Sequence, residues 1–127
     1  MNFRLRTSKK TGDKLKELQD KIRLTPNILC RYAVILSLRN PEPVVNFVKD
    51  TSGLEFNRNT LTGTYDFVFK ALIAQRLERQ ITDEEYFPDL FNAHLERGIT
   101  MLENEYDYAG NQEKMIVNLL TKLPGVG

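Results

Sequence analysis

The 127-residue sequence contains few of the residues from which active sites are usually built. It has one cysteine, Cys30, one histidine, His94, and no tryptophan. A single cysteine excludes an internal disulfide framework and fits a reducing cytoplasm. No Cys/His cluster has zinc spacing, and a glycine-rich phosphate loop, a nucleophile elbow and an EF-hand are all missing. We therefore expect a protein that is not an enzyme on its own and that uses no metal and no cofactor.

Long apolar runs are missing as well. A membrane-spanning helix needs about 20 consecutive apolar residues, whereas the stretch at residues 32–36 is typical of the longest runs here. The arginines near the N-terminus precede no apolar stretch, so we expect no secretory signal. With 41% hydrophobic residues, the chain should fold as one cytoplasmic domain with a single core and without a membrane partner.

The two rare residues are both expected to be structural. Cys30 lies within an apolar helical stretch, which favours an inert, buried thiol. His94 lies on an apolar helical stripe, which favours a partly buried structural histidine over a catalytic base. Neither residue has the neighbours in sequence that would complete a nucleophile, a base and an orienting group.

The sequence is rich in positive charge at one end. Residues 1–40 carry ten Lys or Arg residues against three acids, and residues 41–127 carry eight against fourteen. The net charge of +1 therefore combines a balance of +7 with a balance of −6. This asymmetry suggests a polyanionic partner. We divide the single domain into a basic N-terminal segment (1–40), a helical body (41–123) and a tail (124–127) that should fray.

The basic N-terminal segment has the pattern of a short strand followed by two helices. Residues 2–6 alternate polar and apolar side chains, as in a half-buried strand. Thr7 or Ser8 can cap a helix that extends to about residue 23. Thr25-Pro26 is a strong start for a second, largely apolar helix, which should end before the proline at position 41.

The body is expected to be helical. Apolar periodicity predicts helices over about 64–80, 88–104 and 112–123, with a short capped turn at 82–87 and a loop at 107–111. The residues flanking 50–53 permit a small β-hairpin, and an ordered loop fits equally well. The fold class is therefore mainly α: a compact helical domain with a short N-terminal strand and a possible small β-hairpin.

The lysines of the first predicted helix flank its apolar stripe, because successive residues are about 100° apart around a helix. The flanks consist of Lys10, Lys14 and Lys21 on one side and Lys9, Lys16 and Arg23 on the other. Three acids occupy the outermost band between the flanks. This pattern fits a solvated helix with internal ion pairs. The excess of lysine and the neighbouring Arg4 and Arg6 give a phosphate-binding surface equal weight.

The order of one strand and two helices is also that of a ribbon-helix-helix module. In such modules two chains pair their N-terminal strands, and outward side chains read bases in the major groove. Asn2, Arg4 and Arg6 would be those side chains, and the amides at 25–27 would hold a phosphate at a helix N-terminus. A sequence-specific transcriptional repressor is therefore one hypothesis. A scaffold whose basic face docks an acidic protein partner is another.

A resemblance to a known family covers nearly the whole chain. It is carried, in one order, by RLRTSKKT (4–11), NILCRYA (27–33), SL (37–38), EFN (55–57), TLTGTY (60–65) and HLERGI (94–99). These stretches resemble the DndE family, the small subunit of the bacterial DNA phosphorothioation (sulfur modification) system. The resemblance implies a mostly helical homotetramer that works beside a sulfurtransferase-like subunit and an ATPase subunit.

The resemblance also implies DNA binding, notably of nicked duplex, through surface lysines. By matched position these residues are Lys9, Lys10, Lys14, Lys16 and Lys21, with Arg4 and Arg6 as further candidates. The leading hypothesis is therefore a non-catalytic DNA-binding subunit of the phosphorothioation complex, which contacts the phosphate backbone.

Overall fold

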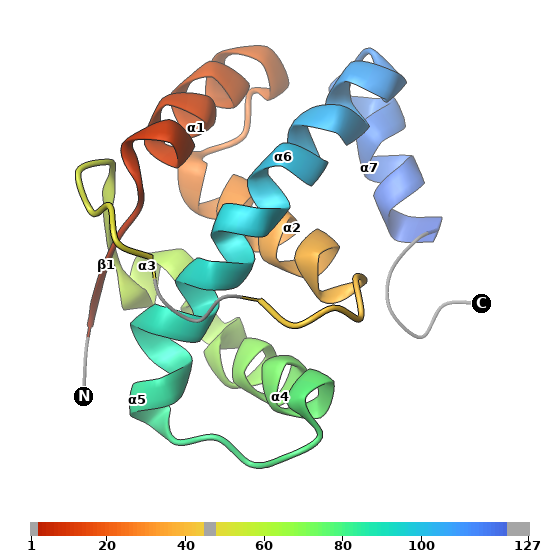
Figure 1. Cartoon of the computed structure of the whole chain (residues 1–127). Helices are drawn as coiled ribbons and strands as arrows, with labels where there is room; N and C mark the ends of the chain where they lie inside the picture. Colours follow the sequence, from red (N-terminus) through yellow and green to blue (C-terminus); the bar gives the residue numbers. More distant parts are fainter. Residues whose placement is uncertain (1–2, 45–47, 122–127) are drawn as a thin grey trace.

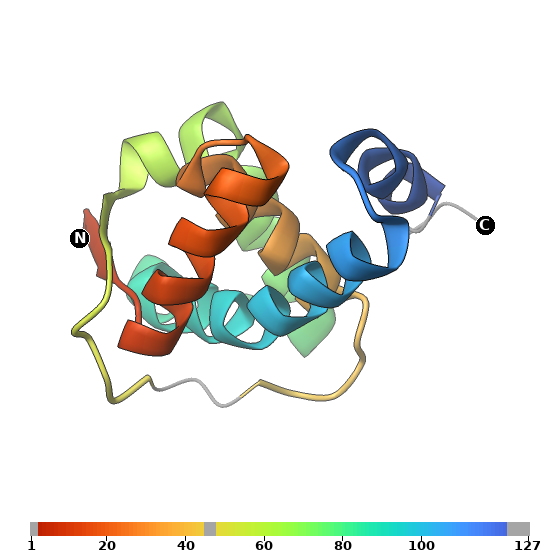
Figure 2. The same cartoon turned by 90° about the horizontal axis from the view of Figure 1, so that it is seen from above.

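Two long helices cross at the centre of the molecule, in a computed structural model that describes residues 3–44 and 48–121. They are α2 (Pro26–Leu38) and α6 (Phe91–Ala109). Helix α1 (Lys9–Ile22) lies at one end of this pair and α4 (Asp66–Leu77) at the other (Figure 1). Helix α7 (Gln112–Thr121) packs beside the last part of α6 (Figure 2). The predicted mainly helical fold class is confirmed.

The contact between α2 and α6 depends on a glycine. A Cβ atom built at Gly98 of α6 would lie 1.8 Å from the carbonyl oxygen of Ala33 in α2. Only a residue without a side chain lets the two backbones approach this closely. Cys30 and His94 are both buried near this crossing, which confirms that they lie inside the fold. No helix in the described part of the chain is long and apolar enough to cross a membrane.

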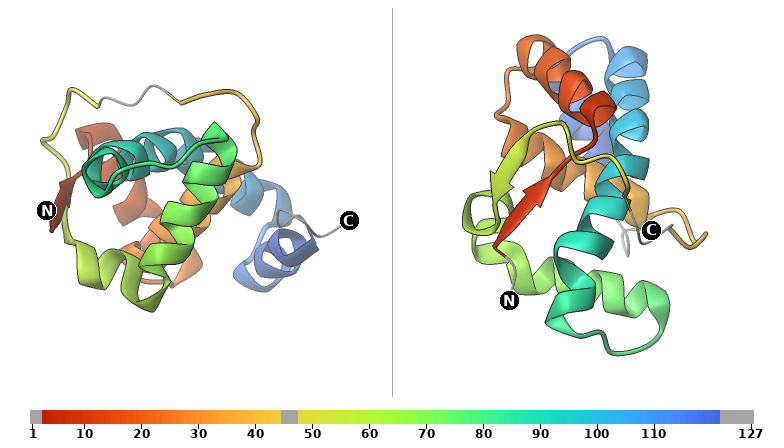
Figure 3. Two further views of the ribbon diagram at one scale, coloured as in Figure 1. Left: turned by 90° about the horizontal axis from the view of Figure 1, so that it is seen from below. Right: turned by 60° about the vertical axis from the view of Figure 1, so that its left-hand side comes forward.

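A two-stranded antiparallel sheet covers one side of this crossing. Strand β1 (Arg4–Arg6) pairs with β2 (Glu55–Asn57), and Leu5 lies opposite Phe56 (Figure 3). Leu5 is buried while its two neighbours in β1 are exposed, as the alternating pattern predicts. Strand β2, which contains part of the second arm of the possible hairpin around residues 50–53, pairs with β1. Residues 45–47, the first arm of that hairpin, lie outside the described residues.

Helices α1 and α2 begin and end close to the predicted residues. Ser8 caps α1, and its Oγ accepts a hydrogen bond from the Thr11 amide at 3.1 Å. Arg23 closes α1 in the left-handed conformation with φ of 65°. Pro26 is the first residue of α2. Local capping chemistry therefore determines these boundaries.

The middle of the body differs from the prediction in its first turns. A short helix, α3 (Arg58–Thr62), and a 3-10 turn, η1 (Gly63–Tyr65), precede α4, which ends at Leu77. Phe69 and Ile73 of the predicted apolar stripe are buried, but Tyr65 is 55% exposed and Val68 is 38% exposed. Their assignment to the inward stripe was wrong. The 3-10 turn η1 takes Tyr65 out of the helical phase of α4, and Val68 lies about 100° around α4 from the buried Phe69.

The last part of the body contains a capped turn and two helices. The Thr82–Glu85 capping box forms as predicted at α5 (Asp83–Glu85), and a kinked segment, η2 (Tyr86–Leu90), with a cis peptide bond before Pro88, leads to α6. Helix α6 continues five residues past the predicted end at 104, because Gly110, with φ of 81°, is the residue that closes it. In α7, Met115 and Leu119 are buried, whereas Leu120, predicted to face inward, is 59% exposed. Leu123 of the same predicted stripe lies outside the described residues.

Candidate nucleic-acid interface

The two arginines of β1 point outward but share one acidic partner. The side chains of Arg4 and Arg6 are 71% and 61% exposed. Arg4 Nη1 lies 3.1 Å from Glu55 Oε2, and Arg6 Nε lies 3.2 Å from Glu55 Oε1. Glu55 lies in β2, directly opposite Arg6. One carboxylate therefore offsets part of the charge that these two arginines could offer to a phosphate.

Two carboxylates of the chain occupy the N-terminal end of α1. The Lys9 amide donates to Asp50 Oδ2 at 3.0 Å, and Ser8 Oγ donates to Glu96 Oε1 at 2.5 Å. Hydrogen bonds from Ser52 and from the Lys9 amide hold the pKa of Asp50 below its usual value. The helix dipole favours negative charge at this end, and the protein supplies that charge itself. A bound phosphate would therefore meet the ammonium groups of Lys9 and Lys10 rather than the amides of this turn.

Lys14 is engaged inside the protein. Its Nζ lies 2.7 Å from Glu103 Oε1 of α6, and the two side chains are only 19% and 28% exposed. The pair joins α1 to α6 where the two helices pack together. Of the candidates predicted from the sequence, Lys14 is therefore the one least available to a ligand.

The remaining lysines of α1 are available to a ligand. Lys9, Lys10, Lys16 and Lys21 are all exposed. Among the described residues, no carboxylate pairs with any of their ammonium groups. They extend along α1 on both sides of its buried stripe of Leu15, Leu18 and Ile22. These four lysines are the exposed basic surface of α1.

The α2 N-terminus, the other predicted phosphate site, faces the body of the protein on one side. Asn27 Nδ2 donates to the Thr60 carbonyl at 3.2 Å, and the Thr25 side chain makes no capping bond. Arg31, one turn further on, donates to the Leu61 and Thr60 carbonyls at 2.8 and 3.2 Å. Sequence reasoning missed these contacts, because they join α2 to a helix that was not predicted. Asn2, the third predicted base-reading residue, lies outside the described residues.

Cys30 and His94 are both buried, and their surroundings shift their pKa values. Burial raises the pKa of the Cys30 thiol far above its ordinary value, so the thiolate does not form near neutral pH. Burial, together with the positive charges of Arg97 and Arg76, lowers the pKa of His94 to about 4. In the described part of the chain, no three His, Cys, Asp or Glu residues gather as metal ligands.

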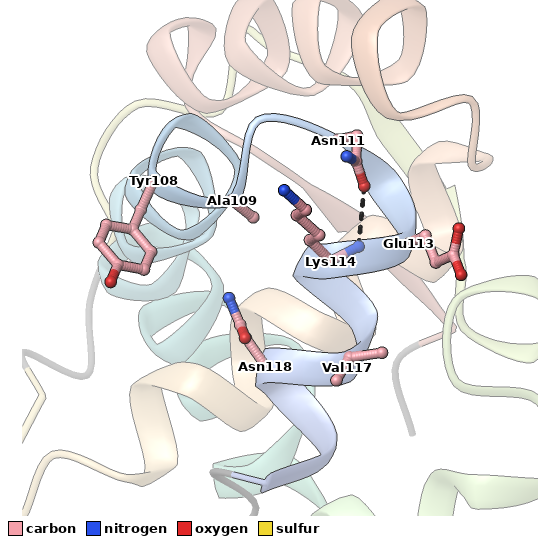
Figure 4. A pocket seen from close by; sticks show the side chains of 7 residues that line it. All are labelled: Tyr108, Ala109, Asn111, Glu113, Lys114, Val117 and Asn118. Atoms are coloured by element: carbon pink, nitrogen blue, oxygen red, sulfur yellow. Dashed lines mark hydrogen bonds between the residues drawn. The ribbon is translucent and has the colours of Figure 1, made fainter.

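A hollow near the C-terminal end of the described chain offers one further basic group. It lies where α6 turns into α7, and Figure 4 shows Lys114 and Asn118 extending on the side of Ala109 while Glu113 points away. The Lys114 amide bonds to Asn111 Oδ1 at 2.8 Å, which begins the helix. Tyr108, at the rim, is 84% exposed. The hollow has no buried polar group and is separate from the α1 lysines.

The fold and the surface together define a small, mainly helical protein whose first helix presents exposed lysines that form no ion pair with any described residue. The family of DNA sulphur modification proteins called DndE matches residues 4–110 of the sequence. This protein belongs to the DndE family. No curated protein matches the sequence. Helix α7 lies beyond the matched residues.

Two solved structures have the same fold. One is DndE from Escherichia coli B7A, involved in DNA phosphorothioation modification, with 24% identity and a TM-score of 0.65 over 80% of this chain and 97% of that chain. The other is a glycine-to-lysine mutant of DndE involved in DNA phosphorothioation. It has 26% identity and a TM-score of 0.63 over 82% of this chain and 99% of that chain.

Proposed function

We propose that this protein is a non-catalytic, DNA-binding component of the bacterial DNA phosphorothioation machinery. The observation that carries the proposal is the exposed basic surface of α1, Lys9, Lys10, Lys16 and Lys21, in a member of a DNA sulphur modification family. Lysine ammonium groups bind phosphates as point charges without reading bases. The ligand that suits this surface is therefore the phosphate backbone of duplex DNA, nicked or intact.

One copy of the chain offers only a narrow basic surface. Asp13, Glu17 and Asp20, which are all exposed, separate the two lysine flanks of α1. A duplex therefore meets one flank at a time, and lysines from neighbouring subunits would have to combine into a wider surface. We infer a homotetramer that works with a sulfurtransferase-like subunit and an ATPase subunit. Light scattering on the purified protein measures this oligomeric state directly.

Single lysine substitutions test where the DNA binds. Lys10→Ala and Lys21→Ala should each weaken binding to every DNA sequence alike. Each should also reduce the slope of the logarithm of the binding constant against the logarithm of the salt concentration by about one. Lys114→Ala, which removes an exposed lysine of α7, is the matched control and should leave binding unchanged. Equal losses in the α1 variants and in the control would contradict the assignment of DNA to α1.

The ribbon-helix-helix alternative has less support. Strand β1 already pairs with β2 of its own chain, and Arg4 and Arg6 both bond to Glu55. A repressor of that type predicts a dimer, a palindromic site and a large loss of specificity in Arg4→Ala. Equal affinity for scrambled DNA would argue against it and for the backbone-binding role.

A further inference from the structure

A cavity of about 240 Å³ lies on the side of the crossing away from α1. The loop that leaves α2 runs beside the C-terminal end of α4, and the first turn of α6 closes the space between them (Figures 1 and 3). Pro41 and Pro43 stiffen the loop side. The polar residues that line the cavity are Glu42, Arg76, Arg79 and His94.

His94 presents a hydrogen-bond donor to this cavity. The residue is only 3% exposed, and its Nδ1 lies 2.9 Å from Ser37 Oγ. Ser37 Oγ also accepts a hydrogen bond from Arg97 Nε at 2.8 Å, and its own hydrogen has no acceptor other than Nδ1 among the described residues, so we assign that hydrogen to the bond with Nδ1. The ring hydrogen is then on Nε2. Within the described chain Nε2 has no partner, and it is the nitrogen available to the cavity.

The charges around His94 are not balanced as they are elsewhere in the protein. Arg58, also buried, forms ion pairs with both Asp66 and Asp83 at 2.8 and 2.7 Å. By contrast, Arg76 bonds to the Leu38 carbonyl, and Arg97 bonds to carbonyl oxygens and to the Ser37 hydroxyl.

The acceptors of these two guanidinium groups are neutral, and they cluster at the end of α2. The carbonyl end of a helix carries only about half a negative charge. Arg79 shares its charge with Glu85, outside the cavity. Glu42 is the one acid among the described residues that line the cavity, and its charge acts on Arg97.

We propose that this cavity is a binding site for a phosphate-class oxyanion, held by the guanidinium group of Arg76 and by the Nε2–H of His94, with the Glu85-paired Arg79 beside them in the lining. Guanidinium groups and a neutral imidazole N–H are all donors, and a tetrahedral oxyanion offers acceptors in several directions. The anion supplies the negative charge that Arg76 and Arg97 lack. The source is either a free phosphate compound or a phosphate of DNA, and the site itself does not depend on the function proposed above.

The single histidine makes the site directly observable. We expect titration with inorganic phosphate, at ionic strength held constant with chloride, to shift the His94 imidazole ¹⁵N signals with saturation in the low-millimolar range. Arg76→Gln should weaken this binding about tenfold or more, because it removes a charge-assisted hydrogen bond. Arg76→Lys should retain part of it. Lys114→Gln, which changes an exposed lysine elsewhere, is the control and should respond like the unaltered protein.

A second arm identifies the source of the phosphate. If Arg76→Gln also weakens binding to duplex DNA while its melting temperature stays close to that of Arg76→Lys, the anion is a DNA phosphate. If DNA affinity is unchanged, the site takes a free phosphate compound. A His94 signal that does not saturate with phosphate, or that responds equally in Arg76→Gln, overturns the proposal, and either result leaves DNA binding by α1 to be judged separately.

Discussion

At the residue scale, the charged side chains divide into those that neutralise one another inside the fold and those left to the solvent. The guanidinium of Arg58 bonds to Asp66 and Asp83 and stacks 5.2 Å from the ring of Tyr86 and 5.0 Å from that of Phe87. This arrangement ties α3, α4 and α5 together. The four exposed lysines of α1, Lys9, Lys10, Lys16 and Lys21, form no ion pair within the described part of the chain, and this difference is the reason for assigning them to a ligand.

His94 should make stability depend on pH. The unfolded chain binds a proton at this residue near pH 6.5, whereas the folded chain does so only near pH 4. The contribution of His94 to the free energy of unfolding should therefore be fully present above pH 6.5. It should fall by about 3 kcal/mol as the pH drops towards 4. Asp66 and Asp83 have lowered pKa values, so their contribution is lost mainly below about pH 4.

Urea titrations at several pH values measure this loss. His94→Asn, in which the side-chain oxygen can take the place of Nδ1 as the acceptor, should show a flat profile between pH 6.5 and 4. An equally steep loss in this variant would assign the pH dependence to other groups.

Arg23 occupies a backbone conformation that suits glycine better. Its φ of 65° is left-handed, and a residue with a side chain costs about 1 kcal/mol there. Arg23→Gly should therefore raise the free energy of unfolding by about 0.5–1 kcal/mol. Gln19→Gly, in the regular part of the same helix, should lower it by a similar amount. A loss of stability in both variants would contradict this account of the helix end.

At the element scale, the crossing of α2 and α6 carries the fold. Gly98→Ala would place a methyl group against the Ala33 carbonyl, so the helices must separate. We expect a loss of about 3 kcal/mol or more, measured by thermal or urea unfolding. Gly110→Ala is the control: it has open space around it but a φ of 81°, so it should cost only about 1 kcal/mol.

The Lys14–Glu103 pair should matter more for the packing of α1 on α6 than for DNA. Lys14→Ala leaves Glu103 without its partner in a partly buried position. We expect a loss of about 1 kcal/mol in stability and a smaller loss of DNA affinity than in Lys10→Ala. A double-mutant cycle with Glu103→Ala isolates the pair. A Lys14→Ala variant with full stability and the weakest DNA binding would reverse this assignment.

The elements that depend on local chemistry could be predicted from the sequence. Ser8, Pro26 and the Thr82–Glu85 capping box determine helix starts by contacts within one turn. The β1–β2 pairing could not be predicted, because Leu5 and Phe56 meet across some fifty residues of intervening chain. Helix α3 was not predicted, because it is one short turn between strand β2 and the longer apolar pattern of α4. The end of α6 was misplaced because acidic residues read as a loop, although Gly110 terminates the helix.

The candidate site likewise has some properties that the sequence predicts and others that it does not. Exposure of Lys10, Lys16 and Lys21 follows from the periodicity of α1, which the sequence contains. The engagement of Lys14 by Glu103 and of Arg4 by Glu55 depends on acids that lie far away in sequence. The cavity at His94 was also missed, because it needs α4, α6 and a loop to meet. The periodicity of the sequence therefore indicates which α1 residues face the solvent, but it could not separate available from engaged charges.

At the scale of the whole molecule, positive charge is available on two separate sides. The exposed basic surface of α1 lies at one end of the α2–α6 crossing, and the cavity with Arg76 and His94 lies on the side away from α1. The first suits an extended polyanion and the second a single oxyanion. Helix α7, beyond the family match, covers neither of them. An assembly of several copies could therefore hold DNA along α1 while the cavities stay accessible.

The most direct test of the central claim is the affinity for duplex DNA measured across a range of salt concentrations. We predict binding that weakens linearly on a log–log plot, with a slope near −0.9 for each phosphate contacted, and equal slopes for scrambled and natural sequences. Gel-shift or fluorescence titration with nicked and intact duplexes of the same sequence provides the data. Affinity that stays undetectable at about 50 mM salt, for either duplex, would contradict a DNA-binding role for this protein.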